Sequence, residues 1–536
     1  FSIEYLTLHT MKKITLFAIA VCAGGLVTTV SAQSAIDAYS LSQGDLRGTA
    51  RFMSMGGAFG ALGGDLSTLN QNPAGIGVYR SSEIGVTVDF DMQSMKTDNF
   101  YKDNHTHVYC NNFGYVGSAF TGSDIMPVFT WGATYTRAAS FDRDYHGSFS
   151  SLPTSLSNYV ASFTDGVAPG DLLIDKNQNP YQGVNGVYPD WLSILSYNSY
   201  LINPQTPTST RYNGLFQNGT TGNSEYMVRE RGSIDEYSVN FGGNFINKIY
   251  WGIGIGITDI RYSRQVFYDE ELQGARIPNA EATGTETGNG YFGLDNFKRI
   301  TGNGYNFKAG VIVKPIDELR FGLAFHTPTY YSLNQNYDAV VDYSYESGYE
   351  GSSDTDLGYF EYRLRTPWKM IASVAGVIGG RAILSFDYQR DAYNSMSLSD
   401  GSNGFNYDYV NNNVKNYYKA SNTYRFGAEL RLTPQFSLRA GYSYQNGGVK
   451  SEAEDQYIEV ETSGTDPSYT FDNSTQYGTV GLGYRYKAFY ADLAYVHRYR
   501  QSTFHPFTAW GDSPNIPTSK LSQRDNNIVV TLGVKF

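Results

Sequence analysis

Apolar and polar residues alternate along short segments through most of this chain. In the last segment, Ile528, Val530, Leu532, Val534 and Phe536 alternate with residues that include Asn527, Thr531 and Lys535. Successive side chains of a β-strand point to opposite faces, so one face of this segment is apolar and the other is largely polar. The pattern therefore predicts a strand that is half-buried or that borders lipid on one side.

The same alternation recurs further up the chain. It is clearest in four places, at Tyr424, Phe426, Ala428, Leu430 and Leu432, at Phe436, Leu438, Ala440, Tyr442 and Tyr444, at Trp251, Ile253, Ile255 and Ile257, and at Tyr305, Phe307, Ala309, Val311 and Val313. A single segment of this kind would also suit a soluble β-sandwich. Its repetition favours a closed barrel with one face towards lipid.

Fourteen strands are predicted, an even number, as bacterial membrane barrels require. Their ranges are 82–95, 112–121, 127–141, 233–247, 249–268, 302–314, 318–344, 358–378, 381–398, 418–432, 435–448, 474–487, 488–501 and 524–536. The connections alternate between short and long. We expect the short turns to face the periplasm and the long loops to face outwards.

The composition supports a membrane barrel over other membrane proteins. The chain has 46 Tyr, 31 Phe and 57 Gly, yet its mean hydropathy is −0.38. After the N-terminal region no run of about 18 apolar residues occurs, which excludes spanning helices. A barrel strand is apolar at alternate positions only, and closure of the sheet pairs every backbone group inside the lipid.

The N-terminal region has the pattern of a secretory signal peptide. Met11 is followed by Lys12 and Lys13, by an apolar run over 14–30 and by the small-residue site Val30-Ser31-Ala32. We expect residues 11–32 to be removed, residues 1–10 to be untranslated upstream sequence, and the mature chain to reach the outer membrane of a Gram-negative bacterium. A single-span anchor is the alternative. Cys22 has no small residue directly before it, which argues against a lipoprotein.

Charge and cysteine content exclude several classes of function. The formal net charge of −11 gives no reason to expect nucleic acid as a partner. Only Cys110 follows the signal peptide, so neither a disulfide within the chain nor a cysteine metal cluster is expected. His105 and His107 fall in a predicted loop, where we expect them to be solvated, and a ligand shared by the two rings is the alternative. No cofactor and no metal site is predicted.

Charged residues of both signs fall at positions that the alternation assigns to the lumen. They are Arg320, His326, Asp387, Arg425, Glu429, Arg439, Arg485 and Asp492. A lumen of mixed charge holds water or packs against a plug. We expect each of these residues to be satisfied by a luminal ion pair, and a ligand contact is the alternative.

Residues 33–80 precede the first strand and do not alternate. They are rich in glycine, which permits tight and irregular backbone. Irregular backbone at membrane depth is tolerated only inside protein or in a wet cavity. We therefore expect this segment to lie inside the barrel, which occupies 81–536.

Three short stretches of this segment resemble a known family. Gly56-Gly57-Ala58-Phe59 with Ala61, Asp65-Leu66-Ser67-Thr68 and Asn72-Pro73-Ala74-Gly75 are similar to the N-terminal hatch of the FadL/OmpP1/TodX family of outer-membrane transporters for hydrophobic compounds. The stretch from Leu323 to Pro328 resembles a recurrent barrel segment of the same family. The resemblance implies an all-β fold, a 14-stranded antiparallel transmembrane β-barrel with an N-terminal hatch, or plug, in its lumen.

The resemblance also implies a mechanism. In this family the hatch blocks axial flow, substrate binds in the lumen, and an inward kink of the third strand opens a lateral path into the membrane. By resemblance, Asn72, Pro73, Ala74, Gly75 and Asp65 are the candidate hatch or gating residues. Gly132 is the candidate kink in the third strand. An ordinary Asx turn that anchors the plug is the alternative for Asn72-Pro73-Ala74.

The connection from residue 142 to residue 232 is far longer than an ordinary loop. Apolar residues three or four apart around 152–163, and a second apolar group at 191–201, predict two short amphipathic helices. By resemblance to the extracellular helices of the family, Trp191, Ile194, Leu195, Tyr159 and Phe163 are candidate walls of a surface groove for ligand. A lid in which the two groups pack together is the alternative.

The resemblance implies passive uptake of hydrophobic molecules, such as long-chain fatty acids or aromatic hydrocarbons, with lumen binding and lateral release. The alternatives are a structural or secretion-associated barrel, as in some Bacteroidetes-like bacteria, and a haem or lipid receptor in which His326 or His497 binds iron. No catalytic constellation occurs, so no enzyme is predicted. The expected partners are a hydrophobic small molecule, outer-membrane lipid and lipopolysaccharide, and the assembly machinery, which Phe536 would signal. We expect a monomer.

Overall fold

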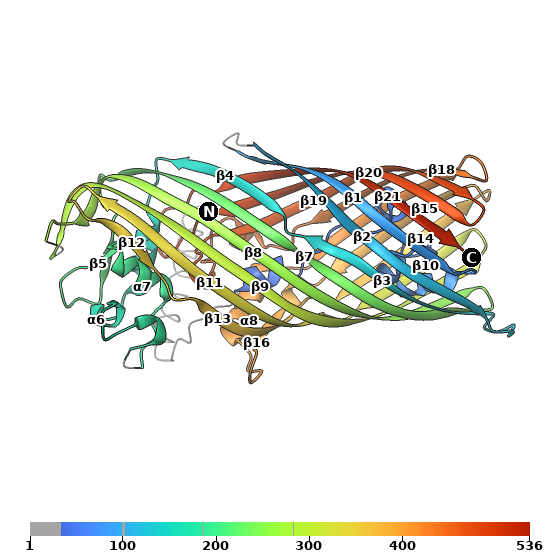
Figure 1. The fold of residues 1–536 in the computed structure, drawn as a ribbon, viewed down its shortest axis with the longest axis horizontal. Coiled ribbons are helices and arrows are strands. Elements are labelled where there is room, and N and C mark those ends of the chain that lie inside the picture. Colours follow the sequence, from blue (N-terminus) through green and yellow to red (C-terminus); the bar gives the residue numbers. More distant parts are fainter. Residues whose placement is uncertain (1–33, 99–101, 185, 282) are drawn as a thin grey trace, which may run out of the picture.

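Fourteen strands pair in chain order and close on themselves in the computed structural model (Figure 1). The structure describes residues 34–98, 102–184, 186–281 and 283–536. The predicted signal peptide at 11–32 and the ten residues before it lie outside the described residues. The barrel closes because β1 pairs with β2 on one side and with β21 on the other, from Glu83 opposite Lys535 to Thr97 opposite Leu521.

Several barrel strands are interrupted and continue as a second element. In chain order the strands are β1 (Glu83–Thr97), β2 (Lys102–Phe120), β3 (Val128–Ser140) continued by β4 (Arg143–Ser150), β7 (Thr221–Phe245), β8 (Ile249–Pro278), β9 (Thr285–Ile316), β10 (Leu319–His326) continued by β11 (Tyr330–Tyr345), β13 (Gly358–Arg365) continued by β14 (Lys369–Ile378), β15 (Ala382–Asp391) continued by β16 (Ser397–Asp400), β17 (Ser421–Arg431), β18 (Phe436–Asn446), β19 (Tyr469–Tyr486), β20 (Phe489–His505) and β21 (Ser519–Lys535). The predicted number of fourteen is confirmed. The short β12 (Glu350–Asp354) pairs with the end of β11.

A belt of apolar side chains covers the outer wall near the end that carries the C-terminus. On β8, Ile253, Ile255 and Ile257 are each about half exposed, and the inward positions between them are glycines. Tyrosine pairs cross neighbouring strands at the upper edge of the belt, as at Tyr135–Tyr237 and Tyr305–Tyr330. A closed sheet with an apolar outer face and aromatic edges is a membrane-spanning barrel.

Above the belt the polarity of the two faces reverses. On β8, Ile260, Tyr262, Val266 and Tyr268 point inwards and are buried. The outward positions between them are mainly polar. β8 has 30 residues, whereas about 10 cross a bilayer, so most of this strand stands in water around an apolar core. The predicted range therefore ends too early on β8, and the predicted ranges begin too late on β7 and β9.

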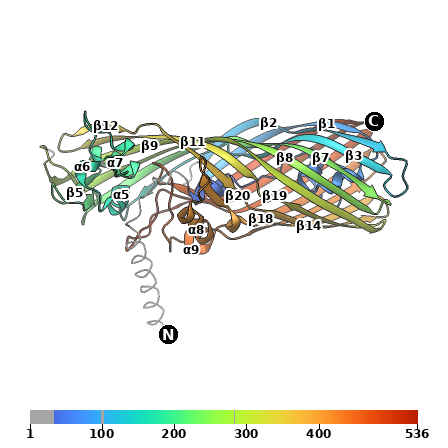
Figure 2. The ribbon, with the colours of Figure 1, turned by 90° about the horizontal axis from the view of Figure 1, so that it is seen from below.

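Short helices gather at the end of the barrel opposite the C-terminus (Figures 1 and 2). They are α5 (Leu156–Thr164), α6 (Pro169–Leu172), η2 (Pro180–Gln182) and α7 (Trp191–Asn198), with the small hairpin of β5 (Ile202–Pro204) and β6 (Tyr212–Gly214). α8 (Asp408–Tyr417) and α9 (Ser451–Glu454), and the 3-10 turn η3 (Tyr393–Ser395), lie lower, where β15 to β18 are shorter. No helix in the described ranges is long and apolar enough to cross a membrane.

The residues before β1 form four short helical elements inside the barrel, where Figure 1 shows them in blue between the strands. They are α2 (Ala35–Ser40), α3 (Ala50–Ser54), α4 (Thr68–Gln71) and η1 (Pro73–Val78). We call residues 34–80 the luminal segment. α2 packs with α8 in an apolar cluster above the belt, in which Tyr39 stacks on Tyr418 at 4.5 Å. α3, α4 and η1 lie lower, against the strands that span the membrane.

Inward-facing strand glycines allow the luminal segment to touch the barrel wall. A Cβ atom added to Gly252, Gly310 or Gly322 would overlap Pro73, Asn72 or Gly60. At Gly427 and Gly441 it would overlap the backbone around Met55. Only glycine leaves room for such an approach between two backbones. The glycines that alternate with apolar residues along the strands are thus the surface on which the luminal segment rests.

We expect Gly441→Val to displace the luminal segment, because the added side chain would overlap the backbone of Met55 and Gly56. Gly478→Val is the matched control, since an added Cβ at this outward position meets nothing within 4 Å. Planar-bilayer recordings should show higher conductance for Gly441→Val than for wild type and for Gly478→Val. Equal conductance of the three proteins would mean that the segment does not seal the lumen.

A histidine is buried in the aromatic core of the extracellular region. His505, at the end of β20, is 0% exposed and stacks on Tyr469 at 4.5 Å. Neither ring nitrogen has a hydrogen-bond partner. Burial lowers the pKa of His505 to about 3. The ring therefore stays neutral in the folded protein at pH values where it would take up a proton in the unfolded chain.

This burial predicts a loss of stability in acid. Below pH 6.5 the unfolded chain binds a proton at residue 505 and the folded protein does not, so His505 alone should lower the free energy of unfolding by about 2 kcal/mol between pH 7 and pH 5. His505→Phe keeps the stacked ring and removes this contribution. Urea titrations at both pH values should show a smaller pH dependence for the variant, and an identical dependence would contradict the assignment.

Candidate functional site

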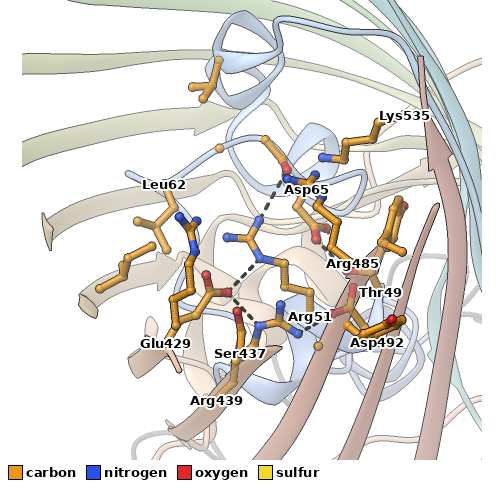
Figure 3. Close-up of a pocket in the computed structure, with 18 of the residues that line it drawn as sticks. Thr49, Arg51, Leu62, Asp65, Glu429, Ser437, Arg439, Arg485, Asp492 and Lys535 are labelled. Carbon is orange, nitrogen blue, oxygen red and sulfur yellow. Dashed lines mark hydrogen bonds and ion pairs between the residues drawn. The ribbon is translucent and has the colours of Figure 1, made fainter. Parts of the chain in front are cut away.

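A chamber of about 380 Å³ lies between the luminal segment and the periplasmic mouth of the barrel (Figure 3). Its roof is formed by residues of the luminal segment, among them Thr49, Arg51, Leu62 and Asp65. Its walls come from strand ends on both sides of the barrel closure. They carry Glu83, Arg320, Glu429, Arg431, Arg439, Arg485, Asp492 and Lys535. The chamber is therefore lined by charge.

A chain of ion pairs connects the roof of this chamber to its wall. Arg51 of α3 lies 3.0 Å from Glu429, and Arg439 lies 2.7 Å from the same carboxylate. Arg439 also reaches Asp492, at 2.5 Å. Figure 3 shows these side chains following one another across the chamber. Glu429 thus holds one guanidinium of the luminal segment and one of the wall.

Asp65 organises the roof from within the luminal segment. Its carboxylate accepts hydrogen bonds from the Thr49 hydroxyl at 2.8 Å and from the Ser67 amide at 2.9 Å. The Thr49 hydroxyl also accepts a hydrogen bond from the Phe52 amide and so caps α3. Asp65 therefore fixes the start of the helix that presents Arg51.

Asn72 forms a turn at the start of η1. Its side-chain oxygen accepts a hydrogen bond from the Ala74 amide at 3.1 Å, and its side-chain nitrogen donates to the Gly60 carbonyl at 2.6 Å. Pro73 and Gly75 continue this turn against the wall at Gly252 and against Thr68. The structure thus places all the candidate hatch residues in one buried unit, and their gating role stays a prediction.

A second cavity, of about 210 Å³, lies on the other side of the luminal segment. It is also polar. Lys308 pairs with Glu236, and Lys369 lies 3.6 Å from Asp391. His326 is buried here, with its Nε2 atom 2.8 Å from the Gln71 carbonyl oxygen. Charged side chains therefore line both of these cavities, and the second one also has apolar lining, which includes Phe52 and Ile371.

The barrel wall has a seam between β2 and the strand formed by β3 and β4. The β2–β3 ladder runs only from Phe120 opposite Val128 to Asn112 opposite Thr136. In the described part of the chain, residues 102–110 of β2 pair with β1 alone, and β4 pairs with β7 alone. Along this length no backbone ladder joins the two sides of the wall.

Side chains bridge the seam instead. The Tyr109 hydroxyl donates to Asp142 at 2.7 Å. Higher up, His105 lies 3.0 Å from Asp144, and in the opposite direction His146 lies 3.0 Å from Asp103. Behind the seam the Arg47 guanidinium of the luminal segment lies 4.8 Å from the centre of the Tyr109 ring. The luminal segment therefore reaches the inner side of the seam.

The seam corrects two predictions from the sequence. His105 and His107 are not in a loop, because β2 begins at Lys102. Gly132 is not a kink, because its pairing is regular with Val116 on one side and Asn240 on the other. The irregularity of the third strand falls between Arg137 and Ala139. The sequence signal of the seam is the absence of apolar alternation in residues 102–107, a pattern that also predicts a loop.

The candidate groove residues of the extracellular region lie in the two predicted helices. Tyr159 in α5, and Trp191, Ile194 and Leu195 in α7, are at most 8% exposed and belong to one apolar cluster. Phe163 is 38% exposed. Their role in ligand capture stays a prediction.

Two further candidates from the sequence, Phe536 and His497, have contacts that do not point to a function. Phe536 is paired through its backbone with Ser82, and its ring is 66% exposed towards lipid. His497 lies 3.0 Å from Asn526 across two strands. Within the described ranges no group of three His, Cys, Asp or Glu side chains is placed to hold a metal ion.

Comparison with known proteins gives matches among solved structures. No family model and no curated protein matches the sequence. A Pseudomonas aeruginosa FadL homologue is 12% identical, over 92% of this chain and 99% of that chain, with a TM-score of 0.51. The toluene transporters TodX of P. putida and TbuX of Ralstonia pickettii are each 13% identical over 92% of this chain and 99% of theirs, with TM-scores of 0.47 and 0.45. The protein has the FadL-family fold.

With its closed wall and apolar belt, this fold is that of an outer-membrane β-barrel. The fold shared with the FadL homologue covers nearly the whole of both chains. At this identity it gives the architecture, and the cargo has to be argued from the site.

We expect Glu429→Gln to loosen the luminal segment, because it removes the charge that holds both Arg51 and Arg439. Removing one partner of a buried ion pair costs about 3 kcal/mol. The variant should be cleaved faster by protease in the luminal segment and should unfold at lower urea concentration. Glu271→Gln, on the exposed outer face of β8, is the matched control. Wild-type protection of Glu429→Gln would contradict an anchoring role.

Proposed function

We propose that the protein takes up hydrophobic small molecules through the outer membrane and releases them sideways through the seam. The seam is the observation that carries this proposal. It begins within the apolar belt, where the outward-facing Val108 and Phe113 of β2 are more than half exposed, and it continues into the extracellular region.

The polar interior favours this route over an axial one. Both cavities beside the luminal segment are lined by charged and amide side chains. Moving an apolar solute through such a lumen would expose each of its methylene groups to a polar surface, at about 0.8 kcal/mol per group. Lateral release from the seam delivers the solute directly to lipid.

In this proposal the luminal segment, with the candidate residues Asp65 and Asn72 to Gly75, is the hatch that closes the axis. The FadL-family fold supports it, because the family that the sequence resembles imports hydrophobic compounds. Ligand would enter through the extracellular cluster that contains Trp191 and Tyr159. We also propose that the protein contacts lipid and lipopolysaccharide, is assembled through the Phe536 signal and is a monomer. The proposal includes no enzymatic activity.

Cross-linking tests the seam directly. In a Cys110→Ser background, Asp103→Cys and His146→Cys place two thiols on opposite sides of the seam, where the native side chains touch. A short bismaleimide joining them should abolish uptake of a hydrophobic fluorescent probe into liposome-reconstituted protein, because the wall can no longer part.

The matched control joins strands that are already held by a ladder. His497→Cys with Asn526→Cys replaces another pair of touching side chains, across β20 and β21, where backbone pairing is continuous. Its cross-link should leave uptake unchanged. Normal uptake with the seam cross-linked would exclude release through the seam.

A second candidate is a structural or secretion-associated barrel. It is favoured by the many charged side chains in the cavities around the luminal segment. Purification in mild detergent distinguishes the two functions. A stoichiometric protein partner, together with no saturable binding of fatty acids or aromatic hydrocarbons, would favour this candidate over transport.

A further inference from the structure

Three guanidinium groups in the periplasmic chamber have no acidic partner. Arg320 of β10, Arg431 of β17 and Arg485 of β19 line the chamber, and none of them takes part in an ion pair with the described residues. The other cations of the chamber are paired. Arg51 and Arg439 share Glu429, and Lys535 lies 2.9 Å from Glu83.

The chamber consequently has an excess of positive charge. Its lining includes six cationic side chains, Arg51, Arg320, Arg431, Arg439, Arg485 and Lys535, against four carboxylates, Asp65, Glu83, Glu429 and Asp492. The excess of two positive charges stands out in a chain whose formal net charge is −11.

Arg320 is only partly satisfied by hydrogen bonds. One of its terminal nitrogens donates to the Leu62 carbonyl on the roof at 2.9 Å. Its Nε atom is sealed from solvent and has no hydrogen-bond partner. A buried donor left without an acceptor costs about 1–3 kcal/mol.

Guanidinium groups select the chemistry of an anion that binds to them. Their planar set of donors matches the oxygens of phosphate and carboxylate groups, and arginine is preferred over lysine for this reason. Two features favour phosphate here. Three unpaired arginines line one chamber, and the excess of two positive charges matches a phosphate monoester, which carries nearly two negative charges at pH 7.

We propose that the periplasmic chamber binds the phosphate group of a small phosphate monoester. The phosphate lies between Arg320, on the wall beneath the roof, and Arg485 and Arg431 at the mouth. Since Arg320 also holds the Leu62 carbonyl, the bound anion ties the luminal segment to the wall from the periplasmic side. This site does not depend on the proposed transport of hydrophobic molecules.

Calorimetric titration of the full-length purified protein with glycerol 3-phosphate and with inorganic phosphate tests the site. We expect saturable binding at one site per chain, which becomes tighter from pH 5.5 to pH 7.5 as the monoester loses its second proton. Arg485→Gln and Arg431→Gln, at exposed positions near the mouth, should each weaken binding at least tenfold. Arg320→Gln should do the same.

Arg261→Gln is the control, because Arg261 lies on the outer face of β8 and its side chain is 73% exposed. It should bind glycerol 3-phosphate as wild type does. Heat-modifiable electrophoretic migration reports whether each variant is folded. The two mouth variants keep the test decisive if Arg320→Gln does not fold.

A second arm separates a soluble phosphate from a lipid headgroup. Protein in nanodiscs of phosphatidylcholine should bind glycerol 3-phosphate as it does in detergent, and exchange of part of the lipid for phosphatidic acid should not compete. Competition by phosphatidic acid would overturn the assignment to a soluble ligand. No saturable binding of either soluble probe, or equal binding by wild type, Arg485→Gln and Arg431→Gln, would overturn the site itself. Neither result depends on whether hydrophobic probes are taken up.

Discussion

The polarity of the two barrel faces reverses where the strands leave the membrane, and most of the architecture follows from this reversal. On β8 the apolar side chains point outwards at Ile253, Ile255 and Ile257 and inwards from Ile260 onwards. Lipid requires an apolar outer face, whereas water requires an apolar interior. One continuous sheet therefore encloses a polar lumen at membrane depth and an apolar core above it. The ladders on both sides of the strand are continuous where the polarity reverses, and the register shift with β9 falls further up, between Leu272 and Ala275.

The lumen at membrane depth contains many polar side chains, and the luminal segment fills it through three kinds of contact. Its backbone lies directly on strand glycines such as Gly252 and Gly441, and its arginines pair with carboxylates of the wall. Ion pairs of this kind offset desolvation only when their geometry and hydrogen bonds are good. Arg51, Glu429 and Arg439 meet that condition with contacts of 3.0 and 2.7 Å. The segment is thus held by close backbone contact, by paired charge and by apolar clusters, one of which packs Phe52 and Phe59 with side chains of the wall such as Val529.

The sequence predicts those parts of the fold that have a local signature. Alternation at 528–536 and 251–257 identified membrane strands, because only the lipid-facing face has to be apolar there. Alternation does not identify residues 102–110 of β2 or the start of β9. These segments lie mostly above the apolar belt, where the outer face meets water and the pattern is weak. The seam could not be predicted, because it is an absence of pairing between β2 and β4 that no single segment encodes. Gly132 was chosen as a kink by resemblance, yet its neighbours pair regularly with it. The chamber arginines were found as luminal charges, but which of them lack a partner depends on contacts between distant strands.

One short stretch of the luminal segment connects the seam, which we propose as the exit, to the periplasmic chamber, which we propose as the anion site. The seam is the weakest length of the wall, because a backbone ladder worth about 1 kcal/mol per hydrogen bond is replaced there by a few partly exposed side-chain contacts. Behind the seam, Arg47 lies against the Tyr109 ring and pairs with Asp89 at 3.0 Å. Four residues further on, Arg51 pairs with Glu429 in the periplasmic chamber. Thr49, between them, is fixed by Asp65. If the seam opens as proposed, a movement that frees Tyr109 would also pull on Arg51, and an anion bound in the chamber as proposed would resist that opening.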